Sequence, residues 1–141
     1  MKILLLLPLI ISLISCSSSY NSKEAIERGD IVDLHGIITN TERLDKFIEN
    51  IKNQEKDNVR ITRYTIEGDP IFYDFTFNGT EVKYKYDNSN DQHGKRNVRS
   101  TVCKALIKNT TLEATEYRLE ECVGKNAEVG NNFRFIIQKN H

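Results

Sequence analysis

The pattern of apolar and polar positions divides the chain into three regions. An apolar run covers residues 3–14, broken by one proline and one serine. Between residues 39 and 52 the apolar positions recur with a helical period, and from residue 58 onward they alternate with the period of a strand. The pattern therefore predicts a short leader, a helix and a β-rich remainder.

The helix is the clearest single element. Four apolar side chains fall at the spacing i, i+3, i+4 and i+7: Leu44, Phe47, Ile48 and Ile51. This spacing places them on one face, which we expect to pack on the core while the charged opposite face is solvated. A second, shorter helix is expected to begin at Ser22 and to end at Gly29.

The segment 71–86 predicts a β-hairpin. Asn78-Gly79 favours a two-residue type I′ turn, which fixes the register of the two strands. The facing pairs would then be Phe75–Val82, Tyr73–Tyr84, Ile71–Tyr86 and Asp74–Lys83. The first three pairs share one face of the sheet.

Further strands are expected on both sides of this hairpin. They cover residues 59–66, 101–108 and 115–122 and a last strand through Phe133, Phe135 and Ile137. The turn 67–70 and a long exposed loop, 87–100, connect them. We therefore expect an α+β fold, with an antiparallel sheet of about six strands packed against one amphipathic N-terminal helix, and one short extra helix.

The leader has the features of a bacterial lipoprotein signal. Lys2 precedes an apolar run well below the roughly 20 residues that a membrane span needs, and Leu13-Ile14-Ser15-Cys16 resembles a lipobox. A buried core helix and an uncleaved anchor are the alternatives. We expect residues 1–15 to be a signal peptide, residues 16–28 a lipidated cysteine with a flexible tether and short helix, and residues 29–141 a single domain.

Lipidation would set the location of the protein. Acyl chains on Cys16, palmitate among them, anchor a chain to a bilayer without crossing it. We therefore expect the domain on the outer face of the cell membrane, with the membrane itself as one partner.

The cysteine count agrees with export. With Cys16 assigned to the lipid, Cys103 and Cys122 remain as a pair, and a disulfide is the usual state of such a pair in an oxidising compartment. Free thiols, a metal site and a catalytic cysteine are the alternatives.

The charge balance argues against nucleic acid as a partner. The chain has 20 basic and 20 acidic residues, and removal of Lys2 with the leader leaves 19 (20 minus 1) against 20, a formal net charge of −1. Proteins that bind nucleic acid concentrate positive charge.

Residues that could perform chemistry are scattered. The three histidines have no second ligand at helical or hairpin spacing. Residues 87–91 are similar to the start of a calcium loop, but Gln92 and Val98 stand where that loop needs a glycine and a glutamate. We therefore expect no metal, no cofactor and no catalytic residue. The candidate binding residues are instead loop residues: Asp69 in the turn, and Asp87, Asp91 and His93 in the long loop.

Several segments together resemble one family of small Gram-positive lipoproteins, domain of unknown function family 4362. They are Gly29-Asp30-Ile31-Val32, His35-Gly36, the run from Arg60 to Pro70, Tyr84-Lys85-Tyr86-Asp87-Asn88 and the two late cysteines. The resemblance covers nearly the whole chain after Cys16. It supports the location and the fold, and it implies no activity, cofactor or catalytic residue.

The functional hypothesis is a non-enzymatic, lipid-anchored extracytoplasmic module that binds a protein or a small molecule. Two alternatives stay open. One is a hydrolase acting on envelope material, with carboxylates brought together only by the fold. The other is an inhibitor or immunity-like protein that caps a secreted partner.

Overall fold

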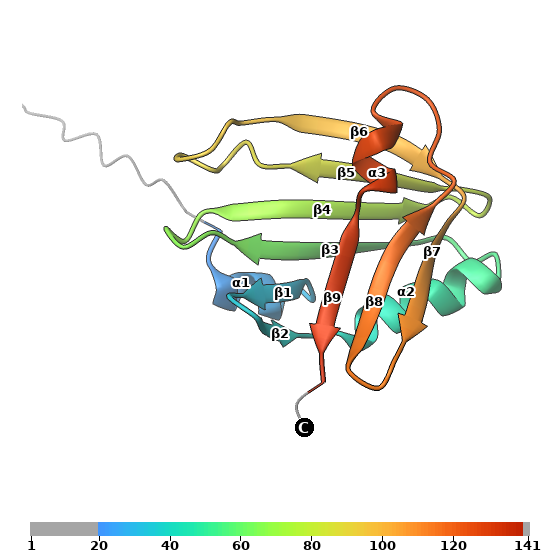
Figure 1. Cartoon of the computed structure of the whole chain (residues 1–141), viewed down its shortest axis with the longest axis horizontal. Coiled ribbons are helices and arrows are strands. Elements are labelled where there is room, and N and C mark those ends of the chain that lie inside the picture. The colour runs from blue at the N-terminus through green and yellow to red at the C-terminus, as the bar shows by residue number, and fades with distance from the viewer. Residues whose placement is uncertain (1–19, 140–141) are drawn as a thin grey trace, which may run out of the picture.

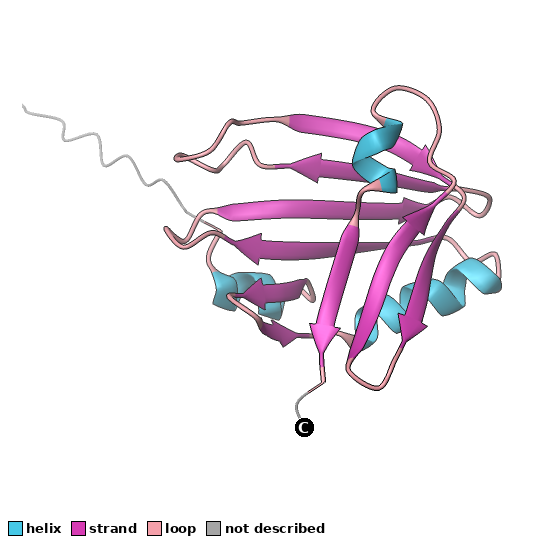
Figure 2. Cartoon of the chain, viewed as in Figure 1, coloured by secondary structure: helices cyan, strands magenta, loops and turns pink. Residues whose placement is uncertain are grey.

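The structure, a computed structural model, describes residues 20–139. These residues form two sheets and three short helices, an α+β fold as expected (Figures 1 and 2). The expected signal peptide, residues 1–15, and the expected lipidation site, Cys16, lie outside the described residues.

The larger sheet has six strands in the order β2-β1-β3-β4-β5-β6. They are β1 Ile31–Leu34, β2 Ile37–Thr39, β3 Asp57–Tyr64, β4 Pro70–Phe77, β5 Val82–Asp87 and β6 Val98–Cys103. β1 pairs with β3 in parallel, and the other pairs are antiparallel. The sequence predicted an antiparallel sheet that did not include β1 and β2. β1 pairs in parallel because β2 and the following helix form a crossover before β3.

The last three strands form a second sheet, which the sequence did not predict. It contains β7 Ala105–Thr110, β8 Ala114–Glu120 and β9 Arg134–Gln138 in the order β7-β8-β9. Figure 1 shows this sheet lying across the larger one. Side chains from both sheets belong to one apolar cluster, so the main core lies between the two layers.

All three helices are short: α1 Ser22–Glu27, α2 Glu42–Lys52 and α3 Ala127–Asn131. The expectation of one amphipathic helix and one short extra helix was therefore incomplete. In α2 the predicted face is correct, because Leu44 and Phe47 are buried while Ile48 and Ile51 pack against the core. α3 has 5 residues, too few for a helical period to be visible in the sequence.

The two faces of β3 contact different apolar clusters. Val59 and Ile61 belong to the main core between the sheets. Tyr64 belongs to a smaller cluster with Ala25 of α1 and Val32 of β1. Because successive side chains of a strand point to opposite faces, α1 covers the face of the larger sheet that the second sheet does not.

The β4–β5 hairpin keeps its predicted faces, but the predicted register was wrong. The structure pairs Phe77 with Val82, whereas the sequence placed Phe75 there. The Asn78 side chain accepts hydrogen bonds from the N–H groups of Thr80 and Glu81 at 2.9 and 3.0 Å, which gives a four-residue connection. Since the shift is two residues, every side chain stays on its predicted face.

The segment predicted as one strand over residues 101–108 divides between the two sheets at Lys104. β6 ends at Cys103 and β7 begins at Ala105. Cys103 and Leu106 belong to the same apolar core although they are three residues apart, which would place them on opposite faces of a straight strand. The predicted pair of Leu106 with Leu119 is present.

The loop between β5 and β6 is shorter and more buried than predicted. It covers residues 88–97, because Asp87 ends β5 and Val98 begins β6. Asn88 and Asp91 are buried, and the Asn88 side-chain amide donates to the Lys95 carbonyl oxygen at 3.0 Å. Polar side chains of this kind satisfy the loop backbone from within, so a polar sequence did not produce a fully exposed loop.

Candidate functional site

A polar pocket of about 320 Å³ opens between α3 and the larger sheet. Figure 1 shows α3 over β5 and β6, and this helix supplies one wall. We call this site the tyrosine–arginine pocket. Its polar lining consists of Arg63, Tyr73, Tyr84, Tyr86, Arg99, Glu128, Asn132 and Arg134.

The tyrosines of the pocket come from adjacent positions on β4 and β5. Tyr73 lies opposite Tyr86 in the sheet register, and the centroids of their rings are 5.5 Å apart. Tyr84 is one pair further along on the same face, with its ring centroid 5.4 Å from that of Phe133. The period of two and the packing of Phe133 therefore hold three phenol rings in a fixed cluster.

All three of these phenols are available as hydrogen-bond donors. Among residues 20–139, the tyrosine hydroxyls that donate hydrogen bonds to protein groups belong to Tyr20, Tyr64 and Tyr117, and not to any of these three. Burial raises the pKa of Tyr84 and of Tyr86 above the ordinary value. Tyr84 lines the pocket and is only 1% exposed, so it has little contact with bulk water.

Two arginines of the pocket are already neutralised. Arg63 Nε donates to Asp33 Oδ2 at 2.8 Å, and Arg134 Nε lies 3.2 Å from Glu116 Oε1. Neither carboxylate lines the pocket. These ion pairs hold the two guanidinium groups in place and leave little unopposed charge on them.

Arg99 is the least engaged arginine of the pocket. Its Nη1 lies 3.5 Å from the Oε1 of Glu128, whose side chain is 62% exposed. The Arg99 Nε atom is buried and has no hydrogen-bond partner among the described residues. The guanidinium lies over the Tyr86 ring, 5.8 Å from its centroid, which favours this position through a cation–π contact.

The pocket is therefore rich in donors. Guanidinium groups donate hydrogen bonds and accept none, and a protonated phenol is a donor as well as an acceptor. The ring faces of the tyrosines add flat apolar area. These donors and ring faces are sufficient to bind a small ligand that presents hydrogen-bond acceptors.

The structure brings three of the four predicted loop residues together. Asp69, Asp91 and His93 each offer one ligand-type atom, and these atoms lie within 4.8 Å of one another. Asp91 Oδ1 accepts from the N–H groups of His93 and Gly94 at 3.0 and 2.8 Å, and Asp69 Oδ2 accepts from the Gln92 N–H at 3.0 Å. These bonds tie the β5–β6 loop to the β3–β4 turn and account for the cluster structurally.

Asp87 is not part of this cluster. It accepts hydrogen bonds from the hydroxyl and the N–H of Ser89 at 2.6 and 3.0 Å, and Lys85 Nζ lies 3.5 Å from its Oδ2. Burial raises the pKa of Asp87, but the bonds from Ser89 and the charge of Lys85 outweigh it and hold the pKa below the ordinary value. Asp87 therefore makes local contacts at the end of β5.

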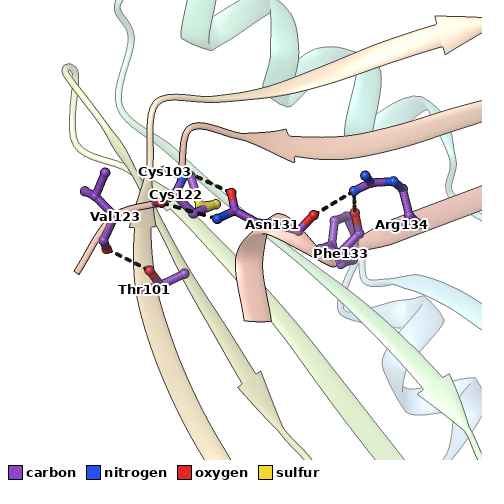
Figure 3. Close-up of a disulfide and its surroundings, with 7 residues drawn as sticks. All are labelled: Thr101, Cys103, Cys122, Val123, Asn131, Phe133 and Arg134. Atoms are coloured by element: carbon purple, nitrogen blue, oxygen red, sulfur yellow. Dashed lines mark hydrogen bonds between the residues drawn. A yellow bond between two sulfur atoms is a disulfide. The ribbon is translucent and has the colours of Figure 1, made fainter. Parts of the chain in front are cut away.

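The Cys103–Cys122 disulfide is present and links the two sheets near the pocket (Figure 3). Asn131 of α3 holds the same segment, because the Cys122 N–H donates to Asn131 Oδ1 at 3.1 Å and Asn131 Nδ2 donates to the Cys122 carbonyl at 3.4 Å. The disulfide and these two bonds fix α3, and with it one wall of the tyrosine–arginine pocket, relative to β6.

A larger groove of about 560 Å³ lies between α2 and β7, an edge strand of the second sheet. Its lining is mainly apolar, and Lys108 Nζ forms an ion pair with Asp45 Oδ2 at 2.8 Å between strand and helix. None of the buried polar atoms that lack a partner among residues 20–139 lines this groove. We therefore place the candidate site in the tyrosine–arginine pocket.

The pattern of the sequence did not predict this pocket. The predicted hairpin placed Tyr73, Tyr84 and Tyr86 on one strand face, but no site was assigned to that face. The residue type could have indicated the site. Most cores are filled by aliphatic side chains, whereas this face carries three tyrosines, whose hydroxyl groups are polar. Arg99 and Glu128 gave no comparable signal, because they come together only through the packing of α3 on β6.

No helix within residues 20–139 is long and apolar enough to cross a membrane. No curated protein and no solved structure matches the chain. A family model does match, over residues 28–118, from the end of α1 into β8 and so across the whole larger sheet. The chain belongs to the family described as Domain of unknown function (DUF4362).

Proposed function

We propose that this protein is an exported lipoprotein, anchored through Cys16 to the outer face of the cell membrane, whose domain binds a ligand in the tyrosine–arginine pocket. It acts as a non-enzymatic binding module. Its partners are the membrane, through the lipid, and a small molecule or a protein segment that enters the pocket.

One observation carries the binding role. Arg99 lines the tyrosine–arginine pocket, and its buried Nε has no hydrogen-bond partner among the described residues. A buried polar group left unpaired costs about 1–3 kcal/mol. A ligand that supplies acceptors would recover this cost, and the fold keeps the site open for it.

The export role is supported by the leader and by the cysteines. The Leu13-Ile14-Ser15-Cys16 segment has lipobox spacing, and the disulfide is the pairing expected in an oxidising compartment. The formal balance of 20 basic and 20 acidic residues supports a partner other than nucleic acid.

The pocket favours binding over hydrolysis. Glycoside and related hydrolases work with a pair of carboxyl groups. Glu128 is the one carboxylate among the described residues that line this pocket, and it is largely exposed. An inhibitor-like role would use a surface of another kind, and the α2–β7 groove is the surface that favours it.

The anchor is tested by metabolic labelling. Cells expressing the full chain are grown with labelled palmitate, and the Cys16→Ala variant is the control. We expect label in the wild-type chain and none in the variant, with the wild type in the membrane fraction. An unlabelled chain that is found in the cytosol with free Cys103 and Cys122 thiols would contradict the proposal.

The binding role is tested by native mass spectrometry of the chain purified from cell envelopes in detergent. We expect an additional mass on the wild-type chain that is lost from the Arg99→Gln variant and kept by Arg118→Gln. Arg118 is a matched control, because it also has a buried Nε without a described partner but does not line the pocket. No added mass, together with turnover of an envelope polymer, would favour the hydrolase alternative instead.

A further inference from the structure

The tyrosine–arginine pocket has more cationic groups than carboxylates. Three arginines line it against one carboxylate, that of Glu128. Asp33 and Glu116 satisfy Arg63 and Arg134 from outside the pocket. The donors that remain for a ligand are the Arg99 guanidinium and the tyrosine hydroxyls, so a ligand must present acceptor oxygens.

Arg99 already holds an oxygen anion, but weakly. Glu128 Oε1 lies 3.5 Å from Arg99 Nη1, and both side chains are partly solvated. Exposed ion pairs of this kind contribute little and exchange readily. The Glu128 carboxylate therefore marks the position that the acceptor oxygens of a ligand would take, and it competes with them.

The Tyr84 side chain adds a second donor on the same side of the sheet. β5 and β6 are adjacent strands, and Tyr84 and Arg99 are separated by two positions of the register, since Tyr84 faces Thr101 and Tyr86 faces Arg99. Side chains two positions apart on a strand share a face. Burial keeps the pKa of Tyr84 above its ordinary value, so this phenol remains a donor throughout the neutral range.

We propose that the tyrosine–arginine pocket binds a small oxyanion, a carboxylate or phosphate group, through the Arg99 guanidinium and the Tyr84 hydroxyl. The proposal names the ligand class of the site and rests on the proposed binding function. The oxyanion replaces Glu128 at Arg99, and the remainder of the ligand lies along the Tyr86 ring.

The test is an NMR titration of the full chain, purified in detergent, with inorganic phosphate and, separately, with sodium acetate. The Nε–H signal of Arg99 and the backbone signals of β5, β6 and α3 are followed. We expect saturable shifts at these positions with at least one of the two anions, and weaker binding as sodium chloride is raised. A response to one anion alone identifies whether phosphate or carboxylate is the group recognised.

Three variants test the residues. Arg99→Gln and Tyr84→Phe should each weaken binding about tenfold, since each removes a donor to an anion. Glu128→Gln should strengthen it about two- to threefold, because it removes the competing carboxylate. This third variant changes an exposed side chain, so it reports on the site even if a core variant folds poorly.

Two controls use the same substitutions elsewhere. Arg118 has a buried Nε without a described partner, and Tyr117 is a buried tyrosine whose hydroxyl donates to Asp45 at 2.8 Å. Neither lines the pocket. Arg118→Gln and Tyr117→Phe should leave the dissociation constant within about twofold of the wild type.

The proposal is overturned if neither anion shifts the Arg99 Nε–H signal, or if the shifts persist unchanged in Arg99→Gln. A neutral molecule that copurifies with the wild-type chain and is lost from Arg99→Gln would overturn the oxyanion class while leaving the binding module intact. Absence of both a copurified molecule and an anion response would remove the proposed function as well.

Discussion

Gly130 is the residue at which α3 approaches the disulfide most closely. A Cβ atom at this position would contact Cys122 Sγ, and it would lie 2.8 Å from Thr101 Cγ2 and 2.9 Å from Cys103 Sγ. All three neighbours belong to buried residues, so none can turn outward into solvent to relieve the contact. The packing of α3 on β6 therefore depends on the absence of a side chain here.

We predict that Gly130→Ala lowers the free energy of unfolding by about 1–3 kcal/mol, the usual cost of overpacking. Helix propensity alone would make this variant more stable, because alanine is favoured over glycine inside a helix by about 1 kcal/mol. A loss of stability would therefore report the packing contact. Urea denaturation of the oxidised protein measures the change. Glu128→Ala, in the same helix but exposed, should change it by less than about 0.5 kcal/mol. An unchanged or more stable Gly130→Ala protein would contradict the packing described.

At the scale of elements, Asp57 connects α2 to β3. It accepts hydrogen bonds from Arg43 and Asn50 of α2, the Asn50 bond at 2.9 Å, and from the Asn58 N–H at 2.8 Å. Burial raises the pKa of Asp57, but these bonds and the Arg43 charge outweigh it and hold the pKa below the ordinary value. The helix is thus attached to the sheet by a carboxylate that must remain ionised.

We predict that Asp57→Asn lowers the free energy of unfolding at pH 7 by about 1–3 kcal/mol. A lowered pKa in the folded state stabilises the protein above the unfolded value, about 3.9, and the stabilisation is lost as the pH falls through the folded value. The variant should therefore lose less stability than the wild type below about pH 4. Urea denaturation from pH 7 to pH 3 measures this, with exposed Glu55→Gln as control. Parallel pH curves for wild type and Asp57→Asn would disprove the role.

The disulfide acts between elements as well, since it joins the end of β6 to the segment after β8 across a sequence separation of 19 residues. Closing a loop of this size stabilises a fold by about 3 kcal/mol in the chain-entropy model. We predict that a reducing agent lowers the free energy of unfolding by about 2–4 kcal/mol. The Cys103→Ala/Cys122→Ala double variant should be less stable than the oxidised wild type and insensitive to the reductant. Equal stability of the oxidised and reduced wild type would contradict this contribution.

The sequence predicts which face a side chain occupies within a strand or helix better than it predicts how two elements pair. Alternation placed Phe75 and Tyr84 on the correct face, and helical spacing placed Phe47 in the core. The register of the hairpin depends on the hydrogen bonds that the Asn78 side chain accepts from the turn backbone. The Asn78-Gly79 pair alone does not determine whether these bonds form. The change of sheet at Lys104 was similarly hidden, because β6 and β7 are both extended and differ only in their partners.

At the scale of the whole molecule, the site depends on contacts that no local pattern contains. Arg99 and Glu128 are far apart in sequence and meet because α3 packs on β6 beside the disulfide. Asp69 and His93 similarly meet because the β3–β4 turn and the β5–β6 loop lie at the same end of the sheet. The sequence identified both as loop residues. The 3.4 Å distance between His93 Nδ1 and Asp69 Oδ2, however, follows only from the fold.

The two apolar clusters also differ in size, which divides the molecule into parts of unequal stability. The main core joins both sheets and α2, whereas the smaller cluster consists of Ala25, Val32 and Tyr64 with Tyr20 packed against it. Tyr20 holds α1 in place, because its hydroxyl donates to Asp30 Oδ2 at 2.7 Å and its carbonyl accepts from the Tyr64 hydroxyl at 2.9 Å. Burial, together with Asp30, raises the pKa of Tyr20 to about 12, so the phenol remains a donor.

We predict that Tyr20→Ala loosens α1 without unfolding the main core. Removing the ring and its hydrogen bond should cost about 1–2 kcal/mol locally, which corresponds to roughly 5- to 30-fold faster amide exchange in α1. Amides of β3 and β4 should keep most of their protection, because Val59, Ile61 and Phe75 of these strands pack in the main core on the other face of the sheet. Hydrogen exchange followed by NMR measures both regions in one experiment, with exposed Lys23→Ala as control. If α1 and β4 lose protection equally in Tyr20→Ala, the two clusters unfold as a single unit and the division proposed here is wrong.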